Sequence, residues 1–186
     1  MYPVNPGAKS ILSVKAYSSV MDIPGDVDMV MIILPPKFAV DAVDQSIVKG
    51  VKGIVIVSAG FREVGGEGRE IEDKIVAKCR ENGVRLIGPN CLGVINPVSS
   101  SSLNASFATR MPEPGNISFI SQSGALCTSV LDVAADRQFG FSKFISIGNK
   151  ADVDELDLLE YLHQDPDTDV ILMYIEELRR GPEFIQ

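Results

Sequence analysis

The chain has 186 residues, of which 45% are hydrophobic, enough for one large or two small domains with a real core. Its net charge of −8 comes from the second half, since residues 1–98 carry 11 basic and 11 acidic residues and residues 99–186 carry 6 and 14. An acidic half without a basic stripe argues against nucleic-acid binding, and the lack of a long apolar run or a cysteine framework predicts a cytoplasmic protein.

The first half of the chain alternates apolar runs with amphipathic stretches. Apolar runs at 29–34, 53–57 and 84–87 predict strands buried on both faces of a parallel sheet. Helical periodicity follows the first run from Val40 to Ile47, and a second helical pattern covers 67–82. Short connections between alternating strands and helices predict a doubly wound α/β sheet.

The second half repeats this alternation after an interruption. Strands are expected at 117–121, 143–147 and 170–175, and helices at 124–137 and 154–162. We therefore expect two domains, 1–98 and 116–186, joined by a serine- and proline-rich linker at 99–115. Because the first residues resemble the end of a strand and the last lie within a helical pattern, we expect a piece of a longer protein.

The turn Ser121-Gln122-Ser123-Gly124 directly follows a predicted strand and opens a predicted helix. The start of a helix presents unpaired backbone N–H groups and the positive end of the helix dipole. Small residues allow an anion, typically phosphate, to approach these groups. In an acidic half of the chain, backbone donors rather than lysines would hold that phosphate.

Ligands of open parallel sheets bind at the carboxyl ends of the strands. The residues that follow the predicted strands are mostly glycine, proline and small polar residues. They are Asn5-Pro6, Pro35-Pro36-Lys37, Ser58-Ala59-Gly60-Phe61, 88–93, 121–124, 148–150 and Glu176-Glu177. Each alone could be an ordinary turn, but together on one edge they favour a binding site.

Five motifs occur in an order and at spacings that resemble the NDP-forming acyl-CoA synthetases. They are Val4-Asn5-Pro6, Ser58-Ala59-Gly60-Phe61, Gly88-Pro89-Asn90-Cys91-Leu92-Gly93, Ser121-Gln122-Ser123-Gly124-Ala125-Leu126 and Gly148-Asn149-Lys150-Ala151-Asp152. The resemblance covers essentially the whole chain. It is greatest to the α part of the ADP-forming acetyl-CoA synthetases, which are related to the succinyl-CoA synthetase α subunit.

The resemblance implies a fold and a role for each half. Residues 1–98 would form a Rossmann-like CoA-binding domain without its first strand and helix, and residues 116–186 would begin a flavodoxin-like ligase domain. The residues implied to contact CoA are Asn5, Pro6, Lys9, Pro35, Pro36, Lys37, Ser58, Ala59 and Gly60. Asn90 and Cys91 would lie near the CoA thiol and the acyl group.

The resemblance also implies a phosphate site. Ser121, Gln122, Ser123 and Gly124 would hold inorganic phosphate and a phosphorylated histidine, and Glu176 would hydrogen-bond that histidine. Glu177 is a competing choice for this role. In the family, acyl-CoA and phosphate give an acyl phosphate, whose phosphoryl group passes to the histidine and then to ADP.

The implied ligands are CoA, an acyl group, phosphate, and ADP or ATP with Mg²⁺. An ATP-grasp domain or β subunit would bind the nucleotide and Mg²⁺, and an oligomer is expected; no metal site is expected in this chain. The histidine and the ATP-grasp domain would lie outside these residues, so the chain alone should be catalytically incomplete.

Two other functions compete with this one. Proteins of the same architecture also serve as CoA- or metabolite-sensing regulatory modules, for example fused to a protein acetyltransferase. A plain nucleotide-binding Rossmann protein lacks support, because no Gly-x-Gly-x-x-Gly follows a predicted strand.

Several single residues have simpler interpretations. His163, the only histidine, follows a helical pattern and is expected to be a solvated helix end rather than the phosphoryl carrier. Cys91 could equally be a packing residue or contact the substrate, whereas Cys79 and Cys127 are expected in the core. Lys9 and Lys37 could pair with CoA phosphates or simply be solvated.

Overall fold

The computed structural model of the chain describes residues 1–98, 100 and 102–185. It begins with a segment in which Val4 forms an isolated parallel bridge to Tyr17. The short antiparallel hairpin of β1 (Ser10–Ile11) and β2 (Val14–Lys15) and a 3₁₀ helix at Val20–Asp22 lie in this segment. Neither the hairpin nor the 3₁₀ helix was expected from the sequence.

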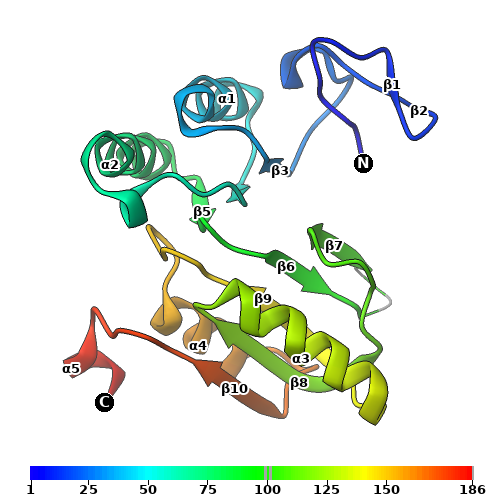
Figure 1. Ribbon diagram of the computed structural model, residues 1–186, viewed down its shortest axis with the longest axis vertical. Helices are drawn as coiled ribbons and strands as arrows, with labels where there is room; N and C mark the ends of the chain where they lie inside the picture. The colour runs from blue at the N-terminus through cyan, green and yellow to red at the C-terminus, as the bar shows by residue number, and fades with distance from the viewer. Residues whose placement is uncertain (99, 101, 186) are drawn as a thin grey trace.

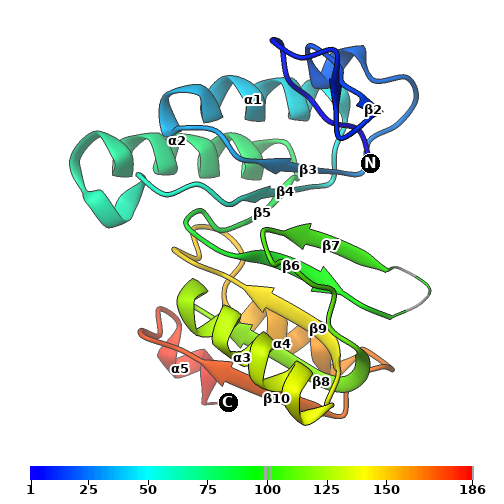
Figure 2. The ribbon, with the colours of Figure 1, turned by 45° about the vertical axis from the view of Figure 1, so that its right-hand side comes forward.

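The first sheet is parallel, with the strand order β3-β4-β5. Its strands are β3 (Met29–Ile32), β4 (Gly53–Ile56) and β5 (Arg85–Ile87). Both of its helices, α1 (Pro36–Lys49) and α2 (Gly66–Glu81), lie on the same face, above the sheet in Figure 2. The core forms because alternate strand residues such as Ile54, Ile56 and Leu86 pack against Val43 of α1 and Ile75 of α2.

The second sheet has five strands in the order β10-β8-β9-β6-β7. They are β6 (Gly93–Asn96), β7 (Leu103–Ser106), β8 (Pro114–Ser121), β9 (Phe141–Ser146) and β10 (Val170–Tyr174). The three strands β10, β8 and β9 are parallel; β6 pairs antiparallel with β9, and β7 pairs antiparallel with β6. Figure 1 shows this sheet below the first one.

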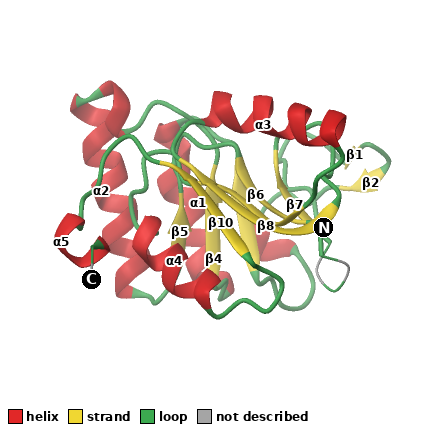
Figure 3. Cartoon of the chain, turned by 90° about the horizontal axis from the view of Figure 1, so that it is seen from below, coloured by secondary structure: helices red, strands yellow, loops and turns green. Residues whose placement is uncertain are grey.

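Two helices cover the parallel part of the second sheet from opposite sides, as Figure 3 shows for α3 (Gly124–Arg137) and α4 (Glu155–His163). On the α3 side, Phe119, Phe141 and Phe144 form the centre of the core. On the α4 side, Ile120 and Ile145 pack with residues of α4. A short helix, α5 (Gly181–Phe184), follows β10.

The expected α/β fold with two parallel units is confirmed: the first unit is the sheet β3–β5 with α1 and α2, and the second is the sheet β6–β10 with α3 and α4. The antiparallel pair β6–β7 is an addition that the sequence did not reveal. Residues 93–96, assigned above to the first domain, pair with β9 of the second sheet. The expected linker 99–115 contains β7, while residues 99 and 101 lie outside the described residues. The domain limits therefore stay a prediction. Every helix formed by the described residues is too short or too polar to cross a lipid bilayer.

Candidate functional site

The loop after β5 and the loop after β9 touch each other through their backbones. The Asn149 N–H donates to the Pro89 carbonyl at 2.9 Å. Gly148 has φ +53°, and a Cβ at this position would lie 2.3 Å from the carbonyl oxygens of Pro89 and Asn90. No side chain fits there, so glycine is what allows the two sheets to meet at the carboxyl ends of β5 and β9.

The turn after β4 joins the same junction. The Ser58 carbonyl accepts the Asn90 N–H at 2.9 Å. At the end of the turn, Gly60 has φ +102°, and a Cβ there would lie 3.1 Å from Cγ of Pro36 at the start of α1. The structure thus brings together the predicted site residues 35–36, 58–60 and Asn90. Ala59 between them is exposed.

The turn before α3 is built by two serines. The buried Ser121 hydroxyl accepts the Ser123 N–H and donates to the Ser123 carbonyl, both at 3.0 Å. Ser123 is the N-cap of α3, and its Oγ accepts the Leu126 N–H at 3.3 Å. The hydroxyl of Ser121 is therefore used inside the turn, and that of Ser123 faces the helix amides.

The first helical amides of α3 remain open. Among the described residues, the N–H groups of Gly124 and Ala125 have no hydrogen-bond acceptor. A Cβ on Gly124 would be 3.8 Å from the backbone nitrogen of Leu92, so the start of α3 lies beside the loop after β5. Two amides without an acceptor and the positive helix end therefore lie next to the loop after β5.

Gln122 connects the start of α3 to the segment after β10. Its backbone N–H donates to the Tyr174 carbonyl at 3.0 Å. Its side-chain Oε1 accepts the N–H groups of Glu176 at 2.6 Å and Glu177 at 3.1 Å. The side chain of Glu176 is exposed, and its backbone is fixed next to the α3 turn.

A buried lysine of the fifth motif, to which no separate role was assigned above, holds the other side of this segment. The side chain of Lys150 is fully buried, and its Nζ binds both carboxylate oxygens of Glu155, at 2.9 and 3.1 Å, and the Glu177 carbonyl. The guanidinium of Arg179 donates to the carbonyls of Lys150 at 2.9 Å and Asn149 at 3.0 Å. Sequence spacing could not reveal the contacts of Lys150 with Glu177 or of Arg179 with residues 149 and 150, because they join residues 27 to 30 positions apart.

The cysteines are buried thiols. Cys91 is 4% exposed and its Sγ donates to the Ile56 carbonyl at 3.4 Å. Burial raises the pKa of the Cys91 thiol to about 12 and that of Cys79 to about 11. Cys91 therefore stays a neutral thiol at neutral pH and is unsuited to nucleophilic attack. Cys79 and Cys127 lie in the core, as expected.

Other predicted residues lie outside the junction or at its margin. Asn5 accepts the Gly7 N–H at 2.8 Å through its side chain, and no hydrogen bond or ion pair of the described residues joins Asn5, Pro6 or Lys9 to the turns above. Lys37 is exposed near the start of α1, with Nζ 4.8 Å from the centre of the Phe38 ring. His163 is the exposed last residue of α4, as predicted.

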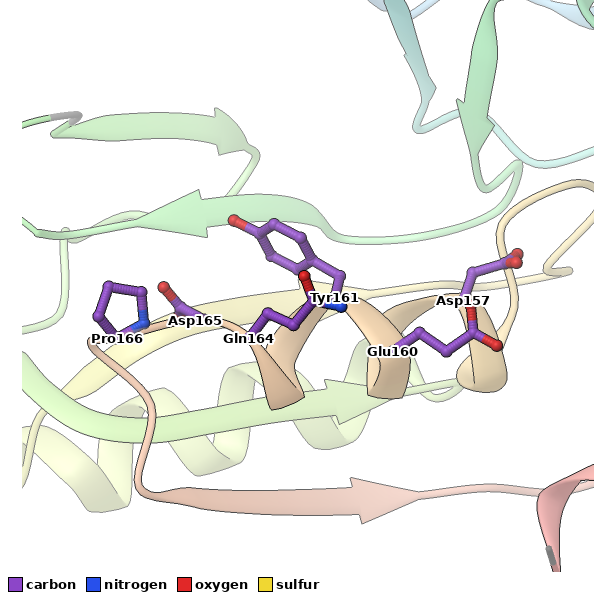
Figure 4. Close-up of a pocket in the computed structure, with 6 residues that line it drawn as sticks. All are labelled: Asp157, Glu160, Tyr161, Gln164, Asp165 and Pro166. Atoms are coloured by element: carbon purple, nitrogen blue, oxygen red, sulfur yellow. The ribbon is translucent and has the colours of Figure 1, made fainter.

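An acidic depression runs along α4, away from these residues. Figure 4 shows its lining residues, which are Asp157, Glu160, Tyr161, Gln164, Asp165 and Pro166. Asp157 pairs with Arg85 at 3.1 Å, and Asp165 pairs with Lys143 at 2.7 Å. Because two of its three carboxylates already have cationic partners and no predicted site residue lines the depression, it is not the candidate site.

Comparison with protein families matches both halves of the chain. The CoA binding domain family matches residues 1–97, and the succinyl-CoA ligase like flavodoxin domain matches residues 114–186. The chain is 45% identical over its whole length to acetate–CoA ligase [ADP-forming] I of Archaeoglobus fulgidus, covering 27% of that protein. It is also 45% identical over its whole length to the α subunit of acetate–CoA ligase [ADP-forming] II of Pyrococcus furiosus, covering 40% of it.

A solved structure shows the same arrangement. It is that of the Candidatus Korarchaeum cryptofilum dinucleotide-forming acetyl-coenzyme A synthetase 1 in complex with phosphate and ADP. Its TM-score is 0.92 at 38% identity, over 99% of this chain and 39% of that one. This chain thus spans less than half the length of these relatives. The chain belongs to the CoA-binding domain family, and it continues into a succinyl-CoA ligase-like flavodoxin domain.

Proposed function

We propose that the chain is the CoA- and phosphate-binding part of an ADP-forming acyl-CoA synthetase. The complete enzyme would interconvert acyl-CoA, ADP and phosphate with the free acid, CoA and ATP. The observation that supports this most is the meeting of the turn after β4, the loop after β5 and the open start of α3 at one junction. A thioester and a phosphate bound there would lie close enough to react.

The first unit has features that suit CoA. The exposed Ala59 and the positive-φ Gly60 leave the backbone of the turn accessible to a ligand. The start of α1 lies beside this turn and offers a positive helix end, and the exposed Lys37 adds a charge for a phosphate group. Lys9 would add a second charge if CoA extends to the first segment.

The second unit has features that suit phosphate. The free amides of Gly124 and Ala125 and the Ser123 hydroxyl would bind its oxygens, with Ser121 and Gln122 holding the turn in shape. Since Gly124 lies beside Leu92, the phosphate would face Asn90 and the neutral Cys91. Attack of phosphate on the thioester carbonyl there would give an acyl phosphate and release CoA.

Glu176 would act on a group supplied from outside these residues. Its backbone is fixed by Gln122, and its exposed carboxylate is free to accept a hydrogen bond from a histidine and favour the ring orientation that receives the phosphoryl group. The nucleotide, with Mg²⁺, would be bound by an ATP-grasp domain or β subunit. We place this assembly in the cytoplasm as an oligomer.

The test uses the complete protein and measures ATP formed from acetyl-CoA, ADP and phosphate. We expect ATP only when all three are present, and Glu176→Gln should lower kcat about 100-fold, the order expected when one positioned polar group is lost at a reaction centre. Glu177→Gln decides between the two glutamates, and Glu183→Gln, an exposed residue of α5, is the control. CoA binding without ATP from acetyl-CoA or other acyl-CoAs would instead indicate the regulatory module.

A further inference from the structure

Asn149 lies at the point where the two units meet. Its side-chain Nδ2 donates to Oε2 of Glu63 at 2.6 Å and to Oε2 of Glu72 at 2.9 Å. Both glutamates belong to the first unit, 86 and 77 residues earlier in the chain. Figure 1 shows the gold segment after β9 rising toward the 3₁₀ helix Arg62–Val64, which precedes α2.

The two glutamates shape the turn after β4. Oε1 of Glu63 accepts the N–H groups of Gly60 at 2.5 Å and Phe61 at 3.2 Å. Oε2 of Glu72 accepts the Arg62 N–H at 3.2 Å, and its Oε1 lies 2.9 Å from the Arg62 Nε. Burial opposes ionisation of Glu63, but the hydrogen bonds from Asn149 and the turn amides hold its pKa below the usual value. Each carboxylate thus fixes a different part of the turn.

The rest of Asn149 is fixed on the side of the acyl and phosphate sites. Its N–H donates to the Pro89 carbonyl, and its Oδ1 accepts the Asn90 Nδ2 at 3.3 Å. Its carbonyl accepts a hydrogen bond from Arg179, which follows the predicted catalytic Glu176. Asn149 therefore connects the turn after β4 to the loops after β5 and β10.

We infer that Asn149 is a positioning residue that sets the CoA-binding turn relative to the acyl and phosphate sites. This inference rests on the proposed function. The primary amide suits the position because its two N–H groups can serve two carboxylates at once, while its oxygen accepts from Asn90. An aspartate has the same shape but brings a third carboxylate to Glu63 and Glu72.

The test is Asn149→Asp in the complete protein. KM for CoA is measured in the direction that forms acyl-CoA from the free acid, CoA and ATP, and is compared with that of the wild type at pH 8 and pH 6. The charged groups that face position 149 are Glu63, Glu72, Arg62 and Arg179. Two nearby carboxylates raise the pKa of a third, so the aspartate gains a proton as the pH falls and can again donate one hydrogen bond. We expect a KM about 10-fold above wild type at pH 8 that recovers to about 3-fold at pH 6, the order of one charge-assisted hydrogen bond.

Two further variants separate positioning from general damage. Asn149→Ala has no proton to gain, so its KM defect should be the same at both pH values. Asn116→Asp is the matched control. Asn116 also donates to a carboxylate, that of Asp169 at 2.8 Å, but it lies near the start of β8, whereas the candidate site lies at the end of that strand. It should leave KM for CoA unchanged at both pH values.

Hydrogen exchange on the ligand-free protein gives an independent readout. Because Asn149 holds the Glu63 carboxylate that accepts the Gly60 and Phe61 N–H groups, Asn149→Ala should speed exchange of these two amides, whether or not the protein makes ATP. A wild type that makes no ATP would defeat the proposed function alone. Unchanged exchange, or an Asn149→Asp variant with wild-type KM or a defect independent of pH, would overturn the inference.

Discussion

At the scale of single residues, the loss of the Lys150 side chain should be costly, because it would leave a buried charge behind. Its fully buried ammonium neutralises Glu155, whose side chain is 2% exposed. Lys150→Met would leave that carboxylate buried with no cationic partner among the residues that the structure describes, and we expect a loss of about 3–5 kcal/mol in the free energy of unfolding. Urea unfolding followed by circular dichroism measures this.

The double variant Lys150→Met/Glu155→Met tests the cause. Removing both charges should recover much of the lost stability, because an apolar pair of similar volume is often as stable as a buried ion pair. Lys52→Met, at an exposed position, should change stability by less than about 0.5 kcal/mol. A double variant no more stable than Lys150→Met would show that the charge on Glu155 is not the reason.

Single residues also show how far the sequence predicts the site. The predicted strand ends alone place four site residues after strands, namely Ser58, Asn90, Ser123 and Glu176. The structure brings two of them, Ser58 and Asn90, into contact. The partners that hold the loops could not be predicted, since Asn149 reaches Glu63 across 86 residues. Such pairs depend on the packing of the two units, which no local pattern encodes.

At the scale of elements, the loops after β5 and β9 depend on Gly148. Gly148→Ala would place a Cβ 2.3 Å from two backbone carbonyls and would also strain a left-handed backbone. Gly50→Ala is the matched control, because Gly50 has φ +87° with nothing within 4 Å of an added Cβ. We expect a loss of about 1 kcal/mol for Gly50→Ala from the backbone alone and about 1–3 kcal/mol more for Gly148→Ala from the collision.

The same unfolding measurement compares the two variants. Equal losses of unfolding free energy in Gly148→Ala and Gly50→Ala would mean that the loops after β5 and β9 can move apart without an energetic cost. The two loops would then not be in tight contact. A larger loss at position 148 would support the close backbone approach on which the candidate site depends.

The elements differ in how well the sequence reveals them. The limits of α3 are as predicted, because the Ser123 N-cap marks its start at Gly124. In contrast, β6 and β7 have four residues each, and β6 finds its partner β9 about 50 residues later. The serine-rich composition between them suggested a linker, and pairing with the second sheet prevailed over this local signal.

At the scale of the whole molecule, Asp152 joins the two units electrostatically. It follows β9, and its carboxylate, with 6% of the side chain exposed, pairs with Arg80 of α2 at 3.2 Å and Arg85 of β5 at 2.9 Å. It also accepts the Leu86 N–H at 3.0 Å. Burial alone would raise the pKa of Asp152, but the hydrogen bonds from Arg85, Leu86 and Arg80 lower it below the usual value.

Because its pKa is lowered, Asp152 should make the folded state less stable as the pH falls. A carboxylate whose pKa is lower in the folded state stabilises the fold above its unfolded pKa of about 4, and the contribution is lost as the pH falls through the folded pKa. The same direction applies to Asp154 beside Arg180 and Asp165 beside Lys143. The free energy of unfolding should therefore be nearly constant from pH 7 to about 5 and decline below about 4.

Asp152→Asn tests whether the ion pairs between the units carry part of that decline. At pH 7 the variant should lose about 2 kcal/mol, because its neutral amide has one acceptor oxygen instead of two and no longer attracts the two arginines as an ion. Below pH 4 it should lose less further stability than the wild type, since it no longer has this proton to gain. Asp26→Asn, at an exposed position of the first segment, should keep the wild-type profile. If the Asp152→Asn profile instead ran parallel to the wild type through the acid range, Asp152 would not couple the docking of the two units to pH.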